Sequence, residues 1–458
     1  MTCARRTAIV AALVAATIAL LALLLPGVAV AHPEVTNTVP GDGATLARMP
    51  DQISVTFGSE FEAPIASLKV YDLDSNRVDN DDAGVYADHP RTVVATTGDL
   101  PDGTYVAIWR AVGLDDGHTV IGKFSFSIGE EFDDSVTAAV AGDLGTGVGG
   151  RVVGLVRLVG LAGALLAAGA GMVVVARLRG RTGRWWRQTS HEVRRLVTVG
   201  ARLAVAAAIV QVPAEAWLRA GGSEGYAAAL AGVLGGTVGL SALVRIGAFA
   251  PFALPVRTTS PVLVVGLWAL GLAGFVVEGH SISEEPFLVV ALADMVHLGA
   301  GAVWFGGLVA LAVVLRRASA TVDAAGVADV VEWFSSSAAV AMVGAALAGS
   351  VLAVVGVGSV EAATGTTYGL LVLAKVALVA VVVGIGGWNR FALVPRIREG
   401  VRTVPEGAAA SAAVPLAPRT VTVAQDAIQR LQRTVRLEAL LLVGVLVLTV
   451  LLAGQPTP

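Results

Sequence analysis

Residues 287–315 read FLVVALADMVHLGAGAVWFGGLVALAVVL, an apolar run of 29 residues whose only ionisable side chains belong to Asp294 and His297. A helix needs about 20 apolar residues to cross the roughly 30 Å hydrocarbon core of a bilayer. The run is therefore expected to form a membrane-spanning helix. Because ionisable side chains inside lipid are costly and commonly functional, we expect Asp294 and His297 to belong to a site within the membrane.

Similar apolar runs recur from Arg151 to the end of the chain. We expect eight transmembrane helices, near residues 152–176, 197–218, 226–249, 260–278, 287–315, 334–357, 367–388 and 437–453. The composition agrees, because 55% of the residues are hydrophobic and only 15% are charged, whereas soluble domains have about 25% charged residues. Residues 151–458 are therefore predicted to form an all-α membrane bundle.

The arginines between these runs predict the orientation of the bundle. The connections that follow odd-numbered helices contain 18 arginines, whereas the opposite side has about two, Arg151 and Arg219. Cytoplasmic loops of membrane proteins carry an excess of basic residues. We therefore expect a multi-pass protein of the plasma membrane, with the part before the helices and the C-terminus both outside the cytoplasm.

The segment before the helices predicts a different fold. From His32 to Asp143 it contains 20 acidic and 6 basic residues, whereas the rest of the chain after residue 31 contains 15 acidic and 24 basic residues. Short runs rich in Val, Ile, Thr and aromatic residues alternate with Pro-, Gly- and Asp-rich turns, as in all-β domains. Residues 123–128 alternate with a period of two, as expected of a half-buried strand. We expect a β-sandwich or small barrel over residues 32–130 and a linker over residues 131–150.

Residues 1–31 are predicted to be a secretory signal. Arg5 and Arg6 precede a long apolar run, and Ala29-Val30-Ala31 fits an A-x-A cleavage site. An uncleaved anchor helix is the alternative. Cleavage after Ala31 would expose the α-amine of His32 beside its imidazole, and these two nitrogens could chelate Cu(II), which prefers nitrogen-rich square sites. An ordinary, unliganded terminus is the other interpretation of His32.

Asp116 and His118 form a second candidate pair. Residues two apart on an extended segment project to the same side, so the pair could offer one oxygen and one nitrogen to a metal. A plain turn followed by a solvent-facing histidine is the alternative. The only cysteine, Cys3, precedes the first apolar run, so soft-metal chemistry in the mature chain would depend on His, Met or carboxylate ligands.

Several motifs in residues 32–129 carry a family resemblance. They are His32-Pro33, PGDGATL at 40–46, QISVTF at 52–57, LPDGTY at 100–105 and Asp116-Gly117-His118. This pattern resembles the CopC family of copper-binding proteins. The resemblance implies a Greek-key β-barrel whose Cu(II) ligands are the amine and imidazole of His32 together with Asp116 and His118. Some members have a separate Met-rich Cu(I) site, but only Met49 lies in this domain, so we expect a single Cu(II) site. His89 matches no ligand of the family, and it is either an auxiliary ligand or an ordinary loop histidine.

The helical part carries further motifs. They include Gly279-His280-Ser281, DMVHL at 294–298, VWFGGL at 303–308, WFS at 333–335, TYG at 367–369, Lys375 and Asn389-Arg390. These residues resemble the CopD family, although Ser281 departs from the alanine more common after the Gly-His pair. A chain with both parts resembles the fused CopC–CopD copper resistance and uptake proteins of the YcnJ type.

Two histidines could form a copper relay in the membrane part. We expect His280 at the outer mouth of the bundle. His297 is expected about 10 residues inside the fifth predicted helix, roughly 15 Å from its outer end at a rise of 1.5 Å per residue. Asp294 precedes His297 by three residues and shares its helix face. The alternative is that His297 only makes a hydrogen bond to Asp294 or to a neighbouring helix. The oxidation state of a copper ion bound there is open.

Charged residues around these histidines suggest further roles. Glu278, Glu284 and Glu285 are expected to surround His280 with negative charge, which would attract cations. Lys375 is expected to pair with a buried carboxylate such as Asp294 or Glu215, because an unpaired charge inside lipid is costly.

The predicted function is copper binding outside the cell and transfer of copper into or across the cytoplasmic membrane. A membrane-tethered copper buffer or sensor that confers tolerance without transport is the alternative. The expected partners are copper ions and the lipid bilayer, not nucleic acid, and we expect no enzyme. A redox protein is a third class to consider, but a haem would need paired histidines, and only His280 and His297 are candidates.

Overall fold

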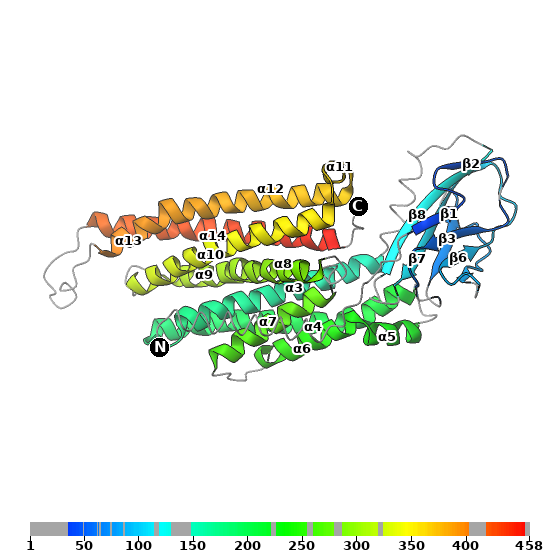
Figure 1. Cartoon of the computed structure of the whole chain (residues 1–458). Helices are drawn as coiled ribbons and strands as arrows, with labels where there is room; N and C mark the ends of the chain where they lie inside the picture. The colour runs from blue at the N-terminus through cyan, green and yellow to red at the C-terminus, as the bar shows by residue number, and fades with distance from the viewer. Residues whose placement is uncertain are drawn as a thin grey trace. The chain divides into compact units, whose positions relative to one another are not determined.

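The structure is a computed structural model of the whole chain (Figure 1). It describes residues 35–453, with the exception of residues 49, 62, 64–65, 74–75, 86–87, 114–118, 130–147, 221–225, 254–259, 279–285, 319–323 and 403–417. Predictions that concern residues 1–31 therefore fall outside the described residues, as does most of the predicted linker.

Among the described residues of the N-terminal part, eight strands form two four-stranded sheets. The first sheet has the order β1 (Val35–Val39), β3 (Ile53–Phe57), β6 (Thr92–Ala95) and β5 (Gly84–Val85). The second has the order β2 (Ala44–Leu46), β8 (Thr119–Ile128), β7 (Gly103–Val112) and β4 (Ser67–Tyr71). Strand β2 pairs with β8 in parallel, and the other strand pairs are antiparallel.

The two sheets share one apolar core. Alternate residues of β3 point inward, so Ile53, Val55 and Phe57 are all buried. They pack against β4, β7 and β8, and the ring of Phe57 meets the indole of Trp109 edge-on at a centroid distance of 5.1 Å. Each fully buried side chain of this kind contributes about 1.5–3 kcal/mol. Residues 123–128 lie in β8 as predicted, but the strand is not half-buried, because the hydroxyl side chain of Ser127 is also buried.

The rest of the described chain is helical. Its α-helices are α3 (Val148–Val173), α4 (Arg184–Ala220), α5 (Tyr226–Gly235), α6 (Thr237–Ala253), α7 (Pro261–Glu278), α8 (Phe287–Gly301), α9 (Gly307–Arg317), α10 (Ala324–Val357), α11 (Val360–Gly365), α12 (Thr367–Trp388), α13 (Val394–Arg402) and α14 (Pro418–Ala453). Three π-helical turns continue α3, α8 and α12: η2 (Val174–Leu178), η4 (Ala302–Gly306) and η5 (Asn389–Leu393). The predicted fold class, an all-β part followed by an all-α membrane part, is confirmed.

Seven helical segments of the described chain are long and apolar enough to span a membrane. They correspond to all the predicted crossings except the one near 226–249, where α5 and α6 meet at an angle of 61°. These two helices count as an eighth crossing only if the bent pair is one span. The break falls at Gly236, and the backbone is too tight there for a side chain at Gly239, which would collide with the carbonyl of Leu234.

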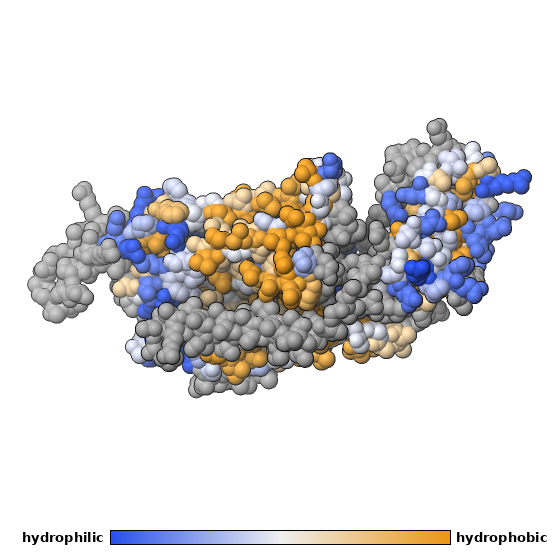
Figure 2. All heavy atoms as spheres, viewed as in Figure 1, coloured by the Kyte–Doolittle hydropathy of each residue, from blue (hydrophilic) through white to orange (hydrophobic). Residues whose placement is uncertain are grey.

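The surface of the helical part is suited to lipid. Figure 2 shows hydrophobic residues gathered over the middle of the visible helical face, with hydrophilic residues near α13. Large apolar side chains on α10, α12 and α14 are exposed, including Leu347, Val354, Val376 and Leu440. Exposed apolar area of this extent would be unfavourable in water but is stable in hydrocarbon.

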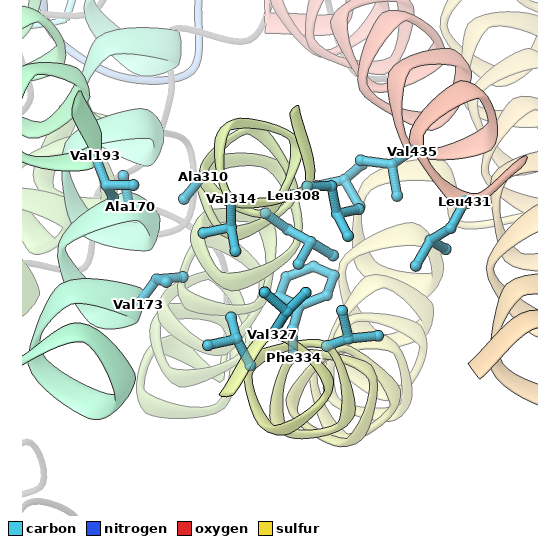
Figure 3. Packing of buried hydrophobic residues seen from close by; sticks show 14 of the residues in the cluster. Ala170, Val173, Val193, Leu308, Ala310, Val314, Val327, Phe334, Leu431 and Val435 are labelled. Carbon is cyan, nitrogen blue, oxygen red and sulfur yellow. The ribbon is translucent and has the colours of Figure 1, made fainter. Parts of the chain in front are cut away.

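Among the described residues of the helical part, buried apolar side chains from seven α-helices pack into one cluster (Figure 3). Figure 3 shows Val173 of α3, Val193 of α4, Val314 of α9, Phe334 of α10 and Val435 of α14 converging on this core. Close approach of α9 and α10 depends on a missing side chain, because a Cβ at Gly307 would lie 2.8 Å from the ring of Phe334.

Candidate metal centres

The ligands predicted in the β-domain, His32, Asp116 and His118, lie outside the described residues. The structure does describe the residues that flank them. Val35, three residues after His32, pairs with Phe57 at the end of β3. Thr119, which directly follows His118, pairs with Val112.

The two flanking segments are connected through aromatic packing. The rings of Phe57 and Phe61 meet edge-on at a centroid distance of 5.0 Å. Phe61 in turn forms a β-bridge with Gly113, which directly follows β7. The residues on either side of the predicted ligands therefore belong to one end of the sandwich.

His89 is described, and its side chain is exposed. Its carbonyl oxygen accepts a hydrogen bond from the backbone N–H of Thr92, at 3.0 Å. The same turn contacts β3, because the N–H of Phe57 donates to the carbonyl of Arg91 at 2.8 Å. The His89 turn thus borders the end of β3 at which β1 begins.

An open cavity of about 420 Å³ lies beside β1 and β8 but is a poor copper site. Its lining offers hydroxyl, amide and aromatic groups, with Lys123 as its cation and Asp42 as its carboxylate. That carboxylate already accepts the backbone N–H of Ser125 at 2.8 Å. In the described part of the chain, no three His, Cys, Asp or Glu side chains come together as a metal site.

His297 of α8 is half-buried and faces α10. Its Nδ1 donates a hydrogen bond to the carbonyl oxygen of Ala345, at 3.2 Å. A carbonyl can only accept, so this contact fixes the proton on Nδ1 and leaves Nε2 as the atom able to bind a metal. The ring lies so close to α10 that a Cβ at Gly349 would be 3.2 Å from its Cε1. The predicted bond to a neighbouring helix is present, and it leaves the metal-binding nitrogen unused.

Lys375 of α12 lies near two of the candidate membrane residues. It interacts electrostatically with Asp294 and with His297. Asp294 is therefore the carboxylate beside Lys375, while Glu215, the other candidate, is buried on α4. The site combines an imidazole, a carboxylate and an ammonium, and the ammonium repels any cation that approaches the first two.

His280, Glu284 and Glu285 lie outside the described residues, but Glu278 is described and differs from expectation. Its Oε1 lies 3.2 Å from Nε of Arg157, and its Oε2 lies 2.8 Å from a guanidinium nitrogen of Arg245. Two arginines thus neutralise this carboxylate. Glu278 therefore adds no net negative charge near the predicted mouth of the bundle.

Sequence reasoning also missed a buried polar cluster on α14 and η5. Glu438 of α14 and Asn389 of η5 are 3% and 6% exposed, and the amide of Asn389 donates to the carboxylate of Glu438. A signal was present, because Glu438 is the only ionisable residue in the predicted span 437–453. Its partner lies 49 residues away in sequence, which no local pattern reveals.

Comparison with known families agrees with this architecture. The CopC domain family matches residues 35–129, and the family described as copper resistance protein D (CopD) matches residues 328–452. Both predicted resemblances are confirmed.

Two relatives share parts of the chain. The copper transport protein CutJ of Bacillus subtilis (strain 168) is 26% identical over 310 residues, which cover 64% of this chain and 56% of CutJ. Copper resistance protein D of Pseudomonas syringae pv. tomato is 32% identical over 169 residues, which cover 35% of this chain and 54% of that protein. The chain thus spans about half the length of the curated relatives it matches.

Two solved structures also match. CopC from Methylosinus trichosporium OB3b is 27% identical and covers 21% of this chain and 93% of its own, with a TM-score of 0.20. PcoC, a methionine-rich copper resistance protein from Escherichia coli, is 28% identical. That match covers 21% of this chain and 99% of PcoC, with a TM-score of 0.19. One chain thus carries a match to the CopC domain family and a match to the CopD family.

Proposed function

We propose that this chain binds copper outside the cell and transfers it into or across the cytoplasmic membrane. The observation that carries the proposal is the presence of CopC and CopD family domains on one chain. Its two relatives are named as a copper transport protein and a copper resistance protein. In this proposal residues 1–31 are a cleaved signal, 32–130 the capture domain, 131–150 a linker and 151–458 the membrane domain.

The capture site consists of His32, Asp116 and His118. Three extended residues reach about 10 Å, so the flanking contacts of Val35 and Gly113 allow the ligand segments to meet at one end of the sandwich. An amine, two imidazoles and a carboxylate form a set that suits Cu(II). His89 is proposed as an auxiliary ligand, because its turn borders β3 at the same end.

The membrane step uses His280 and then His297, with Asp294 beside it. Nε2 of His297 and the carboxylate of Asp294 would receive the ion. Helix α8 holds both side chains on rigid backbone, and the hydrogen bond to Ala345 fixes the imidazole orientation. The copper ion is cargo at this point.

The proposed orientation places the arginine-rich end of the bundle in the cytoplasm. Ion pairs join segments that were predicted to share that side: Arg181 with Asp329 at 2.5 Å, Arg317 with Glu192 at 2.6 Å and Arg398 with Glu332 at 2.6 Å. Connections after the first, fifth and seventh predicted helices therefore meet at one end. An excess of basic residues there fits the cytoplasmic side.

One observation favours the alternative of a tethered buffer without transport. Lys375 lies beside Asp294 and His297, and its positive charge opposes passage of a cation. In a buffer, copper would stay on the β-domain, and the membrane histidines would be structural. The two functions predict different phenotypes for His297→Ala, which should abolish copper entry only if the bundle conducts copper.

The capture half of the proposal is tested by N-terminal sequencing of the purified full-length chain, followed by Cu(II) titration. A mature chain that begins at His32 should bind one Cu(II) in the β-domain, with nitrogen hyperfine structure in its electron paramagnetic resonance spectrum. His118→Ala should weaken this binding, and His191→Ala should not. Retention of residues 1–31 in a chain that still binds Cu(II) tightly would contradict the amine ligand.

A further inference from the structure

The buried cluster around Glu438 contains uncharged partners. The amide nitrogen of Asn389 donates to Oε1 of Glu438, and the indole of Trp304 also bonds to this carboxyl group. The hydroxyl of Thr434 donates to the amide oxygen of Asn389 at 2.7 Å. All three partners are neutral, and Glu438 itself is only 3% exposed.

The nearby arginines are directed elsewhere. On η5, Arg390 donates to the hydroxyl of Ser335 at 3.1 Å. On α14, Arg436 is exposed. It precedes Glu438 by two residues, and helix positions two apart do not face each other.

Several charged groups on the packed helices interact with other groups. Arg398 of α13 pairs with Glu332 of α10, and Arg316 and Arg317 of α9 pair with Glu192 of α4. Lys375 of α12 interacts electrostatically with Asp294. Within the part of the chain that the structure describes, no ion pair involves Glu438. A carboxylate without a counter-ion is very costly in an apolar interior, and such a group commonly takes up a proton instead.

The position of the cluster connects it to the candidate copper path. Trp304 lies in η4, which directly continues α8, and it follows His297 by seven residues, or about 10 Å along the helix. Asn389 lies in η5, another π-helical turn. Such turns interrupt regular helix pairing and are frequent at functional sites. Movement of α8 when an ion binds would therefore reach Glu438 through Trp304.

We propose that Glu438 is a proton-exchange site of the membrane domain, an inference that rests on the proposed copper movement. In the empty state the carboxyl group holds a proton and accepts the bonds from Asn389 and Trp304. A copper cation that passes His297 towards the arginine-rich end favours the ionised carboxylate, and the proton leaves to water. The proton is released to the outer side, and when the ion has left towards the cytoplasm the carboxylate takes up a proton from the cytoplasmic side. Copper and protons therefore move in opposite directions.

Proton binding is tested by infrared difference spectroscopy of the full-length protein in lipid vesicles. The wild type should show a carboxylic acid C=O band that disappears in Glu438→Gln and changes on a shift to alkaline pH or on addition of copper. Glu361→Gln, which alters an exposed glutamate on α11, should keep the band. A wild type without such a band, or with a band that responds to neither pH nor copper, would overturn the proposal.

Coupling is tested in vesicles that contain the same proteins with a trapped pH indicator and a trapped copper indicator. Copper entry into wild-type vesicles should be accompanied by proton movement in the opposite direction. In Glu438→Gln vesicles this proton movement should fall to the level of protein-free vesicles. Should Glu438→Gln not fold, Glu438→Asp retains the carboxyl group and should keep the coupling. Copper entry without proton movement would refute the exchange. Absence of copper entry would instead refute the proposed transport, and the infrared result would still decide whether Glu438 exchanges a proton.

Discussion

In the β-domain, the buried carboxylate of Asp79 is surrounded by donors, whereas in the helical part Glu438 has neutral partners. Asp79 accepts the guanidinium of Arg77 and the backbone N–H groups of Val70 and Asp81. Burial alone would raise the pKa of Asp79, but these hydrogen bonds outweigh burial and lower it. The same functional group therefore stabilises a fold as an anion in one region and is suited to hold a proton in the other.

The helical part contains a second arrangement, in which charge is buried as a pair. Glu278 is held by Arg157 and Arg245, and the Arg245 side chain is only 1% exposed. Asp79, Glu278 and Glu438 differ in the number of cations and N–H donors that lie around the carboxyl group. Substitutions that remove such partners, or the carboxylate itself, should therefore change stability by amounts that differ strongly between the regions.

The largest loss of stability is expected when Glu278 is substituted. Glu278→Gln removes the carboxylate that Arg157 and Arg245 share, and loss of one partner of a buried ion pair costs about 3–5 kcal/mol. Denaturant unfolding of the full chain in detergent micelles measures the change in the free energy of unfolding. Glu361→Gln is the matched control and should change stability by less than about 0.5 kcal/mol. Equal stability of the two variants would show that the buried pair is not a stabilising element.

A smaller effect, dependent on pH, is expected at Asp79. Folding lowers the pKa of Asp79, so its anion stabilises the β-domain fully when the pH is above the pKa of an unfolded aspartate, about 3.9. This stabilisation is lost as the pH falls through the pKa of Asp79 in the folded protein. Asp79→Asn should cost about 1–3 kcal/mol at neutral pH, and it should make stability less sensitive to acid.

Hydrogen exchange of the amides in β3 and β7, followed by mass spectrometry on the full chain, measures this stability. The exposed Asp88→Asn serves as control and should keep the wild-type pH profile. An Asp79→Asn variant that loses stability in acid as steeply as the wild type would show that Asp79 is not responsible for the acid sensitivity.

The smallest effect is expected at the arginine-rich end of the bundle. Arg398→Ala breaks an exposed ion pair with Glu332, and such pairs contribute about 0–1 kcal/mol. Thermal unfolding should therefore be close to that of the wild type. A loss as large as that of Glu278→Gln would mean that this end of the bundle is less accessible to water than the proposed cytoplasmic location requires.

Sequence patterns were sufficient where one local property decides the structure. The length of the apolar run at 287–315 predicted a membrane-spanning segment, which α8, η4 and α9 form. Apolar length did not predict where helices begin, because α10 starts at Ala324 rather than near residue 334. Polar residues such as Glu332 are good helix formers, so the helix continues beyond the part that lipid would cover.

Contacts that depend on helix register could not be predicted. The bond between His297 and Ala345 requires a particular rotation of α10 against α8. The bond between Asn389 and Glu438 requires that η5 packs against α14 in one register. The bend between α5 and α6 was missed because Gly236 lies within an unbroken apolar run, where glycine is compatible with a straight helix. The three capture ligands, predicted from residue type and family resemblance, remain a prediction.

Copper entry into vesicles that contain the full chain tests the central claim most directly. Wild-type vesicles should accumulate copper behind a trapped indicator. His118→Ala should accumulate it only at higher external copper, because capture is weakened, and His297→Ala should not accumulate it at any concentration. If His297→Ala accumulated copper as fast as the wild type, or if the wild type accumulated none, the transfer of copper through the bundle would be contradicted.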